Sequence, residues 1–421
     1  MDLGSIPPWC LHQTITSLSP EKLSLLASSN SYYSQICSSQ VIWRRMYHSR
    51  YPLALFKTEK SQEINDWYKI FSSRYKIAQN ISDPNTKTKV KSFRGENIEK
   101  MRAYSNAFAF NSSKSVNVIA YSYTDSSCEY SVVSEIPSIC SDFLFLDQNS
   151  IVSVGSQAVS LFDIGTKNEI SRFSNKIGEN PHIDSLSNGL FVVVSKTNGF
   201  VYDVRDNCDT KCSFEHQMNP ISIATNGNTL YIASESDISA HDIRNPRGPI
   251  LWNYTIPSRN VSTYCSFGIN EGVALFGSSV INLISGRVIQ SSIANDIVCG
   301  SVFSNNIVVC GCRQQEVLFY DYQKGGVIDK QEFGAKEAIK CVHVSTMNNT
   351  IAIGGSFTIR LYSSSLQNGK VQINGIRTVS CGSVGLRTKG DDLLARQVLY
   401  DGERLVTNMG SFVRVYDYFL G

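Results

Sequence analysis

Cysteine and histidine are the residue types in this sequence that could bind a metal or act as nucleophile and base. The chain has 12 cysteines and 6 histidines among 421 residues. No Cys-x-x-Cys or His-x-x-x-His spacing occurs, and the closest cysteine pairs are Cys310-x-Cys312 and Cys208-x-x-x-Cys212. Zinc sites need several such ligands at short, recognisable spacings. No Gly-x-Ser-x-Gly elbow or phosphate-binding loop occurs either. We therefore expect no catalytic residue, no metal site and no cofactor.

Charge and hydropathy exclude further classes. The net charge is +3, whereas nucleic-acid-binding domains usually show a strongly basic face. The longest apolar runs, at residues 190–195 and 307–310, have the length of strands, and a membrane span needs about 20 residues. The first residues lack the basic and apolar regions of a secretory leader. We expect a cytoplasmic or nuclear protein with reduced, packed thiols and neither nucleic acid nor membrane as partner; a Cys310–Cys312 disulfide is the alternative.

The first ~80 residues show helical periodicity. Ser19-Pro20-Glu21 is a helix start, because serine caps the helix, proline fits its first turn and an acidic side chain suits the positive end of the dipole. Leu23 and Leu26 then fall on one face. Residues 40–51 and 64–75 carry further apolar stripes. Between residues 86 and 102 the composition becomes basic, with Lys87, Lys89, Lys91, Arg94, Lys100 and Arg102. We interpret this stretch as a solvated linker, or alternatively as a basic arm for an acidic partner.

After about residue 104 short alternating runs separated by Gly, Asn and Ser indicate strands. A two-strand pattern recurs, in which the second strand ends in an aromatic residue and Asp or a close variant. The anchors of this pattern are Phe162, Tyr202, His241, Leu283, Tyr320, Tyr362 and Tyr416. They recur about every 40 residues, which is the period of a four-stranded propeller blade. The last interval is longer, and we place the insertion at residues 380–390.

Seven anchors predict seven blades. Only five residues follow Tyr416, so the outermost strand of the last blade has to come from elsewhere. Because open sheet edges favour aggregation, we expect a strand from residues 104–123 to close the ring. Residues 116–123 and 128–133 could instead form most of an extra blade, which would give eight.

The combination resembles an F-box/WD-repeat protein. Residues 5–48 resemble an F-box, with Ile6-Pro7 at the start, Ser19-Pro20-Glu21-Lys22-Leu23 in the middle and Ile42-Trp43-Arg44-Arg45-Met46 at the end. The pairs Phe162-Asp163, Tyr202-Asp203, His241-Asp242, Tyr320-Asp321 and Tyr416-Asp417 stand where Trp-Asp would be in WD repeats. The expected fold is mainly β: an all-α F-box domain (5–50), a helical and basic linker (51–103) and a WD-repeat-like β-propeller (104–421).

The resemblance implies a non-catalytic substrate receptor of a Skp–cullin–F-box (SCF) ubiquitin ligase. Such a receptor raises the effective concentration of substrate lysines near a ubiquitin-loaded enzyme. The residues that the resemblance places against the Skp-type adaptor are Pro7, Leu11, Ile15, Leu18, Pro20, Leu23, Leu26, Ile42 and Trp43. Several of these could instead form the core of the small helical domain itself, although ~45 residues are too few to bury all of them.

By the same resemblance, basic residues near the top of the ring would bind a protein substrate. Lys196 and Arg313 lie in turns between second and third strands, and Lys340 lies early on an inner strand. Arg suits bidentate capture of phosphate or carboxylate, so we expect an acidic or phosphorylated peptide. Three unrelated surface charges are the alternative. Two other functions stay open: an adaptor-binding scaffold without ligase activity, and an enzyme built on a propeller.

Overall fold

The computed structural model describes the chain in two parts. The first part covers residues 20–29, 31–43 and 80. The second part covers residues 88–417, with gaps at 105–106, 124–127, 174–176, 187–188, 206–209, 217, 246–247, 257–263, 295, 304–305, 334–336, 346–349, 357, 368–369, 382–394 and 401–403. No helix among these residues is long and apolar enough to cross a membrane.

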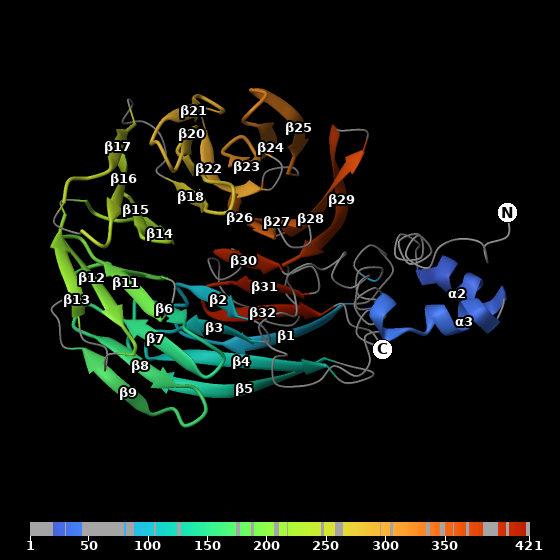
Figure 1. Ribbon diagram of the computed structural model, residues 1–421, viewed down its shortest axis with the longest axis horizontal. Helices are drawn as coiled ribbons and strands as arrows, with labels where there is room; N and C mark the ends of the chain where they lie inside the picture. Colours follow the sequence, from blue (N-terminus) through green and yellow to red (C-terminus); the bar gives the residue numbers. More distant parts are fainter. Residues whose placement is uncertain are drawn as a thin grey trace.

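Two helices precede the sheets, α2 (Pro20–Ser29) and α3 (Ser31–Cys37). The start of α2 at Pro20 confirms the predicted helix start. Leu23 on α2 is buried, as are Ile42 and Trp43 after α3, and the Trp43 indole Nε1 donates a hydrogen bond to Cys37 O at 2.7 Å. The predicted helix over residues 64–75 lies outside the described residues. The two helices lie to one side of the ring of sheets (Figure 1).

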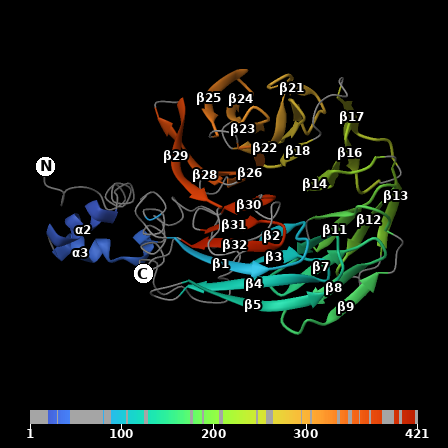
Figure 2. The ribbon, with the colours of Figure 1, turned by 180° about the vertical axis from the view of Figure 1, so that it is seen from behind.

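The rest of the chain forms eight four-stranded antiparallel sheets arranged as a ring (Figures 1 and 2). Blades 1 to 4 consist of β2 (Met101–Tyr104), β3 (Ala107–Asn111), β4 (Ser115–Tyr123) and β5 (Cys128–Pro137); β6 (Asp142–Phe145), β7 (Ser150–Val154), β8 (Val159–Asp163) and β9 (Glu169–Phe173); β10 (His182–Ser185), β11 (Leu190–Val194), β12 (Asn198–Asp203) and β13 (Thr210–Glu215); and β14 (Ser222–Asn226), β15 (Thr229–Ala233), β16 (Asp237–Asp242) and β17 (Trp252–Thr255).

Blades 5 to 7 repeat this order, and blade 8 departs from it. They consist of β18 (Cys265–Gly268), β19 (Val273–Phe276), β20 (Ser279–Asn282) and β21 (Val288–Gln290); β22 (Ile297–Phe303), β23 (Ile307–Cys312), β24 (Glu316–Asp321) and β25 (Gly326–Glu332); β26 (Ile339–Ser345), β27 (Thr350–Gly355), β28 (Thr358–Gln367) and β29 (Lys370–Ser380); and β30 (Gln397–Tyr400), β31 (Arg404–Asn408), β32 (Phe412–Asp417) and β1 (Lys89–Arg94). The first strand of each blade contacts the first strand of the next, so these eight strands line the centre.

The closing strand is β1, which pairs antiparallel with β32 from Lys89↔Asp417 to Arg94↔Phe412. The expectation that residues 104–123 close the ring is therefore wrong, and so is the preference for seven blades; the alternative of eight is confirmed. Residues 104–123 and 128–133 belong to blade 1. The propeller also begins before the expected boundary at residue 104, because β1 and the start of β2 lie within the stretch interpreted as a linker.

A β-bulge explains the repeat and the missed blade. In four blades the pairing of the third and fourth strands shifts register directly before a predicted anchor, at Leu161/Phe162, Val201/Tyr202, Phe319/Tyr320 and Leu361/Tyr362, and in blade 5 it shifts at Val280/Ile281. The same shift in blade 1 falls at Val118/Ile119. The anchor of blade 1 is therefore Ile119, which no aromatic-Asp pair reveals, and the anchor of blade 5 is Ile281 rather than Leu283.

The Asp of the repeated pair shapes the turn that follows. Asp163 Oδ1 accepts a hydrogen bond from Thr166 N at 2.7 Å, and Asp321 Oδ1 accepts one from Lys324 N at 3.0 Å. Asn282 does the same in blade 5 with Ser285 N at 2.9 Å. Side-chain oxygens of Asp and Asn satisfy backbone donors of tight turns in this way. The repeat thus encodes a buried anchor followed by a capped turn.

Candidate functional site

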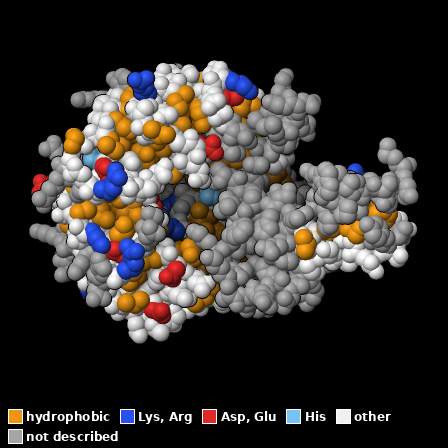
Figure 3. Space-filling view, viewed as in Figure 1, with side chains coloured by type: hydrophobic (Ala, Val, Ile, Leu, Met, Phe, Trp, Pro, Cys, Tyr) orange, Lys and Arg blue, Asp and Glu red, His pale blue; other side chains and the backbone are white. Residues whose placement is uncertain are grey.

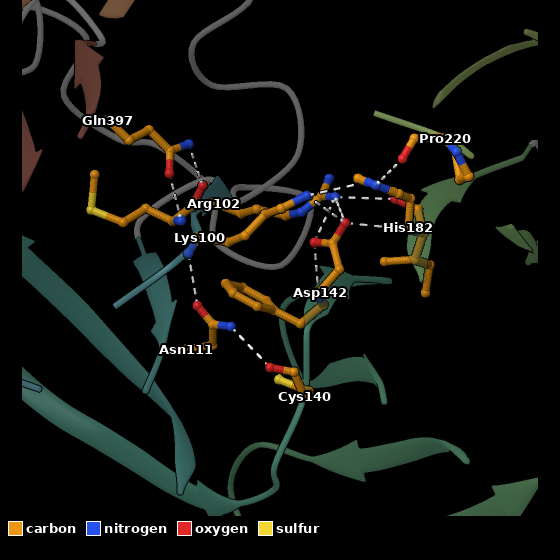
Figure 4. Close-up of polar contacts among 11 residues, drawn as sticks. Lys100, Arg102, Asn111, Cys140, Asp142, His182, Pro220 and Gln397 are labelled. Carbon is orange, nitrogen blue, oxygen red and sulfur yellow. Dashed lines mark hydrogen bonds and ion pairs between the residues drawn. The ribbon is translucent and has the colours of Figure 1, made fainter. Parts of the chain in front are cut away.

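A polar cluster of the described residues lies where the first strands of blades 1, 2 and 3 begin (Figure 4). Its centre is Asp142, the first residue of β6, whose side chain is only 1% exposed. Lys100 Nζ lies 3.1 Å from Asp142 Oδ2, and Arg102 Nη2 lies 3.0 and 3.1 Å from the two carboxylate oxygens. The amide of Ile183 on blade 3 lies 3.4 Å from Asp142 Oδ2. One carboxylate thus joins three blades.

The charges of this cluster follow from its contacts. Burial alone would raise the pKa of Asp142, but Arg102 and Lys100 hold it below its ordinary value. Burial, followed by the charge of Lys100, lowers the pKa of His182 to about 4. His182 is therefore neutral at pH 7, and the cluster carries two positive charges against one negative charge. The cation side chains are about one-third exposed, at 35% for Lys100 and 30% for Arg102.

The protonation of His182 can be assigned from its two neighbours. Its Nε2 lies 3.1 Å from Pro220 O on blade 4, and a carbonyl oxygen can only accept. The hydrogen of the neutral ring is therefore on Nε2. Nδ1 is left as an acceptor, 3.4 Å from Lys100 Nζ. His182 thus links Lys100, which directly precedes β2 of blade 1, to Pro220, which precedes β14 of blade 4.

Backbone-directed side chains extend the network to blade 8. Gln397 Oε1 accepts a hydrogen bond from Met101 N at 2.8 Å, and Gln397 Nε2 donates to Met101 O at 2.9 Å. Asn111 accepts from Lys100 N at 2.8 Å and donates to Cys140 O at 3.0 Å. These bonds fix the backbone that carries both cations. The space-filling view shows a hollow at the centre of the ring with Lys or Arg and His side chains near it (Figure 3).

The arrangement suits recognition of an anion. Two fixed, partly exposed cations with one excess positive charge can bind a carboxylate or phosphate. Among the described residues no group of three or more His, Cys, Asp or Glu could hold a metal ion. Nine cysteines are free, among them Cys310 and Cys312, so these two form no disulfide. Burial raises the pKa of Cys299 to about 12, which keeps this thiol protonated.

The three predicted substrate residues lie on the face where the first strands begin, since turns between second and third strands share that face. They do not form one cluster. Lys196 is in blade 3, Arg313 in blade 6 and Lys340 in blade 7, so Lys196 and Lys340 lie on opposite sides of an eight-membered ring. All three are exposed. Lys196 Nζ lies 3.6 Å from Glu179 Oε2, and Lys340 is the extra residue of a bulge between Ile339 and Cys341.

The predicted adaptor residues divide into two groups. Pro7, Leu11, Ile15 and Leu18 lie outside the described residues, and Pro20 opens α2. Leu23, Ile42 and Trp43 are buried, and Leu26 is partly buried. Among the described residues before the propeller, the large apolar side chains that are exposed are two that the resemblance did not single out, Leu25 at 70% and Val41 at 54%. Adaptor contact by the predicted residues stays a prediction.

Comparison with known proteins defines the fold class. No family model and no curated protein match the sequence. Among solved structures, the chain is similar to the C-terminal WD40 domain of Sif2, with a TM-score of 0.60, 11% identity and coverage of 78% of this chain and 98% of that one. It is also similar to the computationally designed protein Ika8, with a TM-score of 0.58, 16% identity and coverage of 77% and 98%.

A third similar structure is BamB from Moraxella catarrhalis, with a TM-score of 0.52, 13% identity and coverage of 78% and 96%. Identities this low show the fold alone. Together with the eight four-stranded sheets, they define a mainly β protein with a WD40-type β-propeller of eight blades, preceded by a few helices.

Proposed function

We propose that this protein is a non-catalytic interaction subunit, and specifically the substrate receptor of an SCF-type ubiquitin ligase. The observation that carries the proposal is that a small helical unit with exposed apolar side chains precedes a propeller with a cationic site at its centre. We call this site, formed by Lys100 and Arg102 where the central strands begin, the channel end. WD40-type propellers generally act as protein-interaction scaffolds. The F-box resemblance of residues 5–48 supports the ligase assignment, with a Skp-type adaptor and a cullin–RING ligase as partners in the cytoplasm or nucleus.

The adaptor would bind to the helical unit. A small helical domain cannot bury all of its apolar residues, and the surplus marks a partner surface. Among the described residues, Leu25 and Val41 are this exposed surplus. Leu23, Ile42 and Trp43 are buried and belong to the core of the helical unit. A substitution at Leu23 or Trp43 would therefore disturb the fold and the binding together.

The test is co-purification with a Skp-type adaptor. We expect the double variant Leu25→Asp/Val41→Asp to lose the adaptor while its thermal unfolding is unchanged. The matched control is Val327→Asp on blade 6, which replaces a side chain of similar exposure and should retain the adaptor. Retention of the adaptor by the Leu25/Val41 variant would refute this docking surface. A cullin subunit in the wild-type eluate would support a ligase receptor, and its consistent absence beside a bound adaptor would favour a scaffold without ligase activity.

The substrate would be an acidic or phosphorylated segment bound across the channel end. Lys100 and Arg102 supply two cations near the centre, and Lys196, Arg313 and Lys340 supply three more around the same face. We expect a fluorescent polyglutamate peptide and its phosphoserine-containing counterpart to bind, with affinity that falls as salt rises. The variant Lys196→Gln/Arg313→Gln/Lys340→Gln should weaken binding, and unchanged affinity would remove these three residues from the site.

A further inference from the structure

The outer strands of the eight blades differ in how they protect their open edge. Each is the last strand of its sheet, with one neighbour on the inner side among the described strands. Exposed edges are commonly guarded by short strands, by bulges or by charged side chains, because unpaired backbone groups can pair with another chain. Six outer strands follow this rule: β1, β5, β9, β13, β25 and β29 each contain at least one charged residue.

The two exceptions are neighbours. β17 reads Trp-Asn-Tyr-Thr and β21 reads Val-Ile-Gln, and neither contains a charge. They belong to blades 4 and 5 and lie next to each other at the rim of the ring in both ribbon views (Figures 1 and 2). An edge without charges is thus confined to one place on the molecule.

Exposed aliphatic side chains gather at the same place. Ile284, in the turn before β21, is 83% exposed, and Val288 and Ile289 on β21 are also exposed. On blade 4, Ile250 and Leu251 directly precede β17 and are exposed as well. Five exposed aliphatic residues at one blade junction exceed the scattered single residues of an ordinary surface. Hydrophobic side chains also gather over this part of the ring in the space-filling view (Figure 3).

A hydrogen bond and a close backbone approach join the two blades at this junction. The Trp252 indole Nε1 donates a hydrogen bond to Leu283 O at 3.1 Å, which ties β17 to the turn of blade 5. Gly286 adopts φ of +68°, and a Cβ there would lie 2.6 Å from the indole ring, so the turn lies directly on Trp252. Ile284 and Leu251 each flank one partner of this bond in the sequence. The backbones that carry these two aliphatic side chains are therefore held close together.

We propose that this blade 4–blade 5 rim, formed by β17, β21 and the turn carrying Ile284, binds an extended segment of a partner protein by strand addition. The open edge of β21 would provide backbone hydrogen bonds, and the aliphatic side chains would provide pockets for alternate residues of the segment. The segment is largely uncharged, because the strands it meets carry no charge. It has a carboxylate near one end, facing the exposed Arg287 that directly precedes β21. This site is separate from the channel end and from the helical unit.

The experiment selects ligands against the full chain. A displayed library of random eight-residue peptides is enriched on the wild-type protein and counter-selected on Ile289→Lys, which gives β21 the charge that other edges carry. We expect enriched peptides with alternating aliphatic residues and one acidic residue. Ile289→Lys and Ile284→Asp should each raise the Kd of a synthetic copy by about tenfold or more.

The matched control is Ile170→Lys on β9, an isoleucine of 58% exposure on an outer strand that already carries charges. It should leave the Kd within about twofold, and all three variants should keep the wild-type melting temperature because they lie on the surface. N-methylation of alternate peptide nitrogens should abolish binding in one register only, since an added strand uses every second amide.

Three results would overturn the proposal. Enriched peptides could bind wild type and Ile289→Lys equally, which would place their site elsewhere. They could tolerate N-methylation in both registers, which would exclude strand addition. The wild-type protein could sediment as a dimer that Ile289→Lys converts to a monomer, which would assign the rim to a second copy of this chain.

Discussion

Around the central channel, the blades are joined in two different ways. From blade 8 through blades 1 to 4, polar groups bridge the first strands: Gln397 to the backbone of Met101, and Asp142 to Arg102 and to the amide of Ile183. From blade 5 to blade 8, the described junctions consist mainly of apolar side chains, thiols and glycines, with the Tyr264 hydroxyl donating a hydrogen bond to Gly300 O between blades 5 and 6. Cys299 and Ile339, for example, share one core cluster across blades 6 and 7. Apolar clusters also join blades 1 to 4, so the polar half adds charged and polar bridges to the close packing that both halves share.

The polar half also contains the cations that the proposed substrate site needs. An ion pair holds Lys100 and Arg102 in fixed positions, and their partial exposure leaves them accessible. A buried ion pair adds little to stability compared with apolar packing, so such groups are retained for specificity or function in some proteins. The apolar half has no comparable cluster of a buried carboxylate with two cations among its described residues.

The largest effect is expected for Asp142→Leu in the polar half. The substitution leaves Lys100 and Arg102 without their carboxylate, and removing one partner of a buried pair costs about 3 kcal/mol. Urea denaturation measures the loss in the free energy of unfolding. The control is Asp163→Asn, which preserves the acceptor of an exposed turn and should cost under about 0.5 kcal/mol. A loss below about 1 kcal/mol for Asp142→Leu would show that the pair does not hold the blades together.

The second prediction concerns the pH dependence of the free energy of unfolding, to which His182 in the polar half should contribute. The folded pKa of His182 is about 4, and the ordinary value in an unfolded chain is about 6.5. Between these values the unfolded chain binds a proton that the folded chain excludes. The stabilising contribution is complete above pH 6.5 and is lost as the pH falls, by about 2 kcal/mol at pH 5 for this residue.

His241 in blade 4, whose pKa burial and the neighbouring His216 lower to about 4, adds to this acid sensitivity. Equilibrium unfolding at pH 7 and pH 5 measures the effect, and His182→Gln should remove its share. In the apolar half, buried thiols such as Cys299 stay protonated throughout this range. Equal pH dependence of wild type and His182→Gln would contradict the assignment of a neutral, buried His182.

The third prediction tests the apolar half. At Gly311 on β23 a Cβ would lie 2.5 Å from Ile339 Cγ2 and 2.8 Å from Cys299 Sγ. Gly311→Ala should therefore cost roughly 1–2 kcal/mol through overpacking, with no change in pH dependence. Gly326→Ala on β25 is the control, because nothing lies within 4 Å of a Cβ there. Equal melting temperatures of both variants would show that blades 6 and 7 are not closely packed.

The smallest effect is expected at the exposed surface of the polar half, in blade 3. Lys196 and Glu179 form an ion pair that is mostly exposed, and such pairs contribute at most about 1 kcal/mol. Lys196→Gln should leave the free energy of unfolding within about 0.5 kcal/mol of wild type while weakening binding of the acidic peptide. A large loss of stability would mean that Lys196 has a structural role rather than a binding role.

The sequence predicts the propeller well because the repeat encodes a local structure. An anchor after a bulge recurs in blades 2, 3, 6 and 7, an Asp or Asn caps the next turn in several blades, and both features depend on neighbours close in the chain. Blade 1 was not counted among the repeats because Ile119 replaces the aromatic anchor. Strand β1 was not predicted as a strand because an outermost strand faces solvent. Lys89 and Lys91 therefore interrupt the apolar alternation that marks inner strands.

The channel-end cluster could not be predicted from local patterns. Lys100 and Arg102 appear in the sequence as part of a basic stretch, and Asp142 carries no motif. The three meet only because the ring places blades 1 and 2 side by side, and because β1 places the basic stretch against the ring rather than in a linker. Their pairing therefore depends on the closure of the whole ring.

The central claim is that one ring of eight blades is closed by a strand from the N-terminal side, which also attaches the helical unit. Native-state hydrogen exchange of residues 89–94 tests it most directly. The amides of β1 that pair with β32 should exchange as slowly as those of β30 and β31, and in the same cooperative opening. Exchange of these amides at the rate of an unstructured peptide, with β31 still protected, would contradict it.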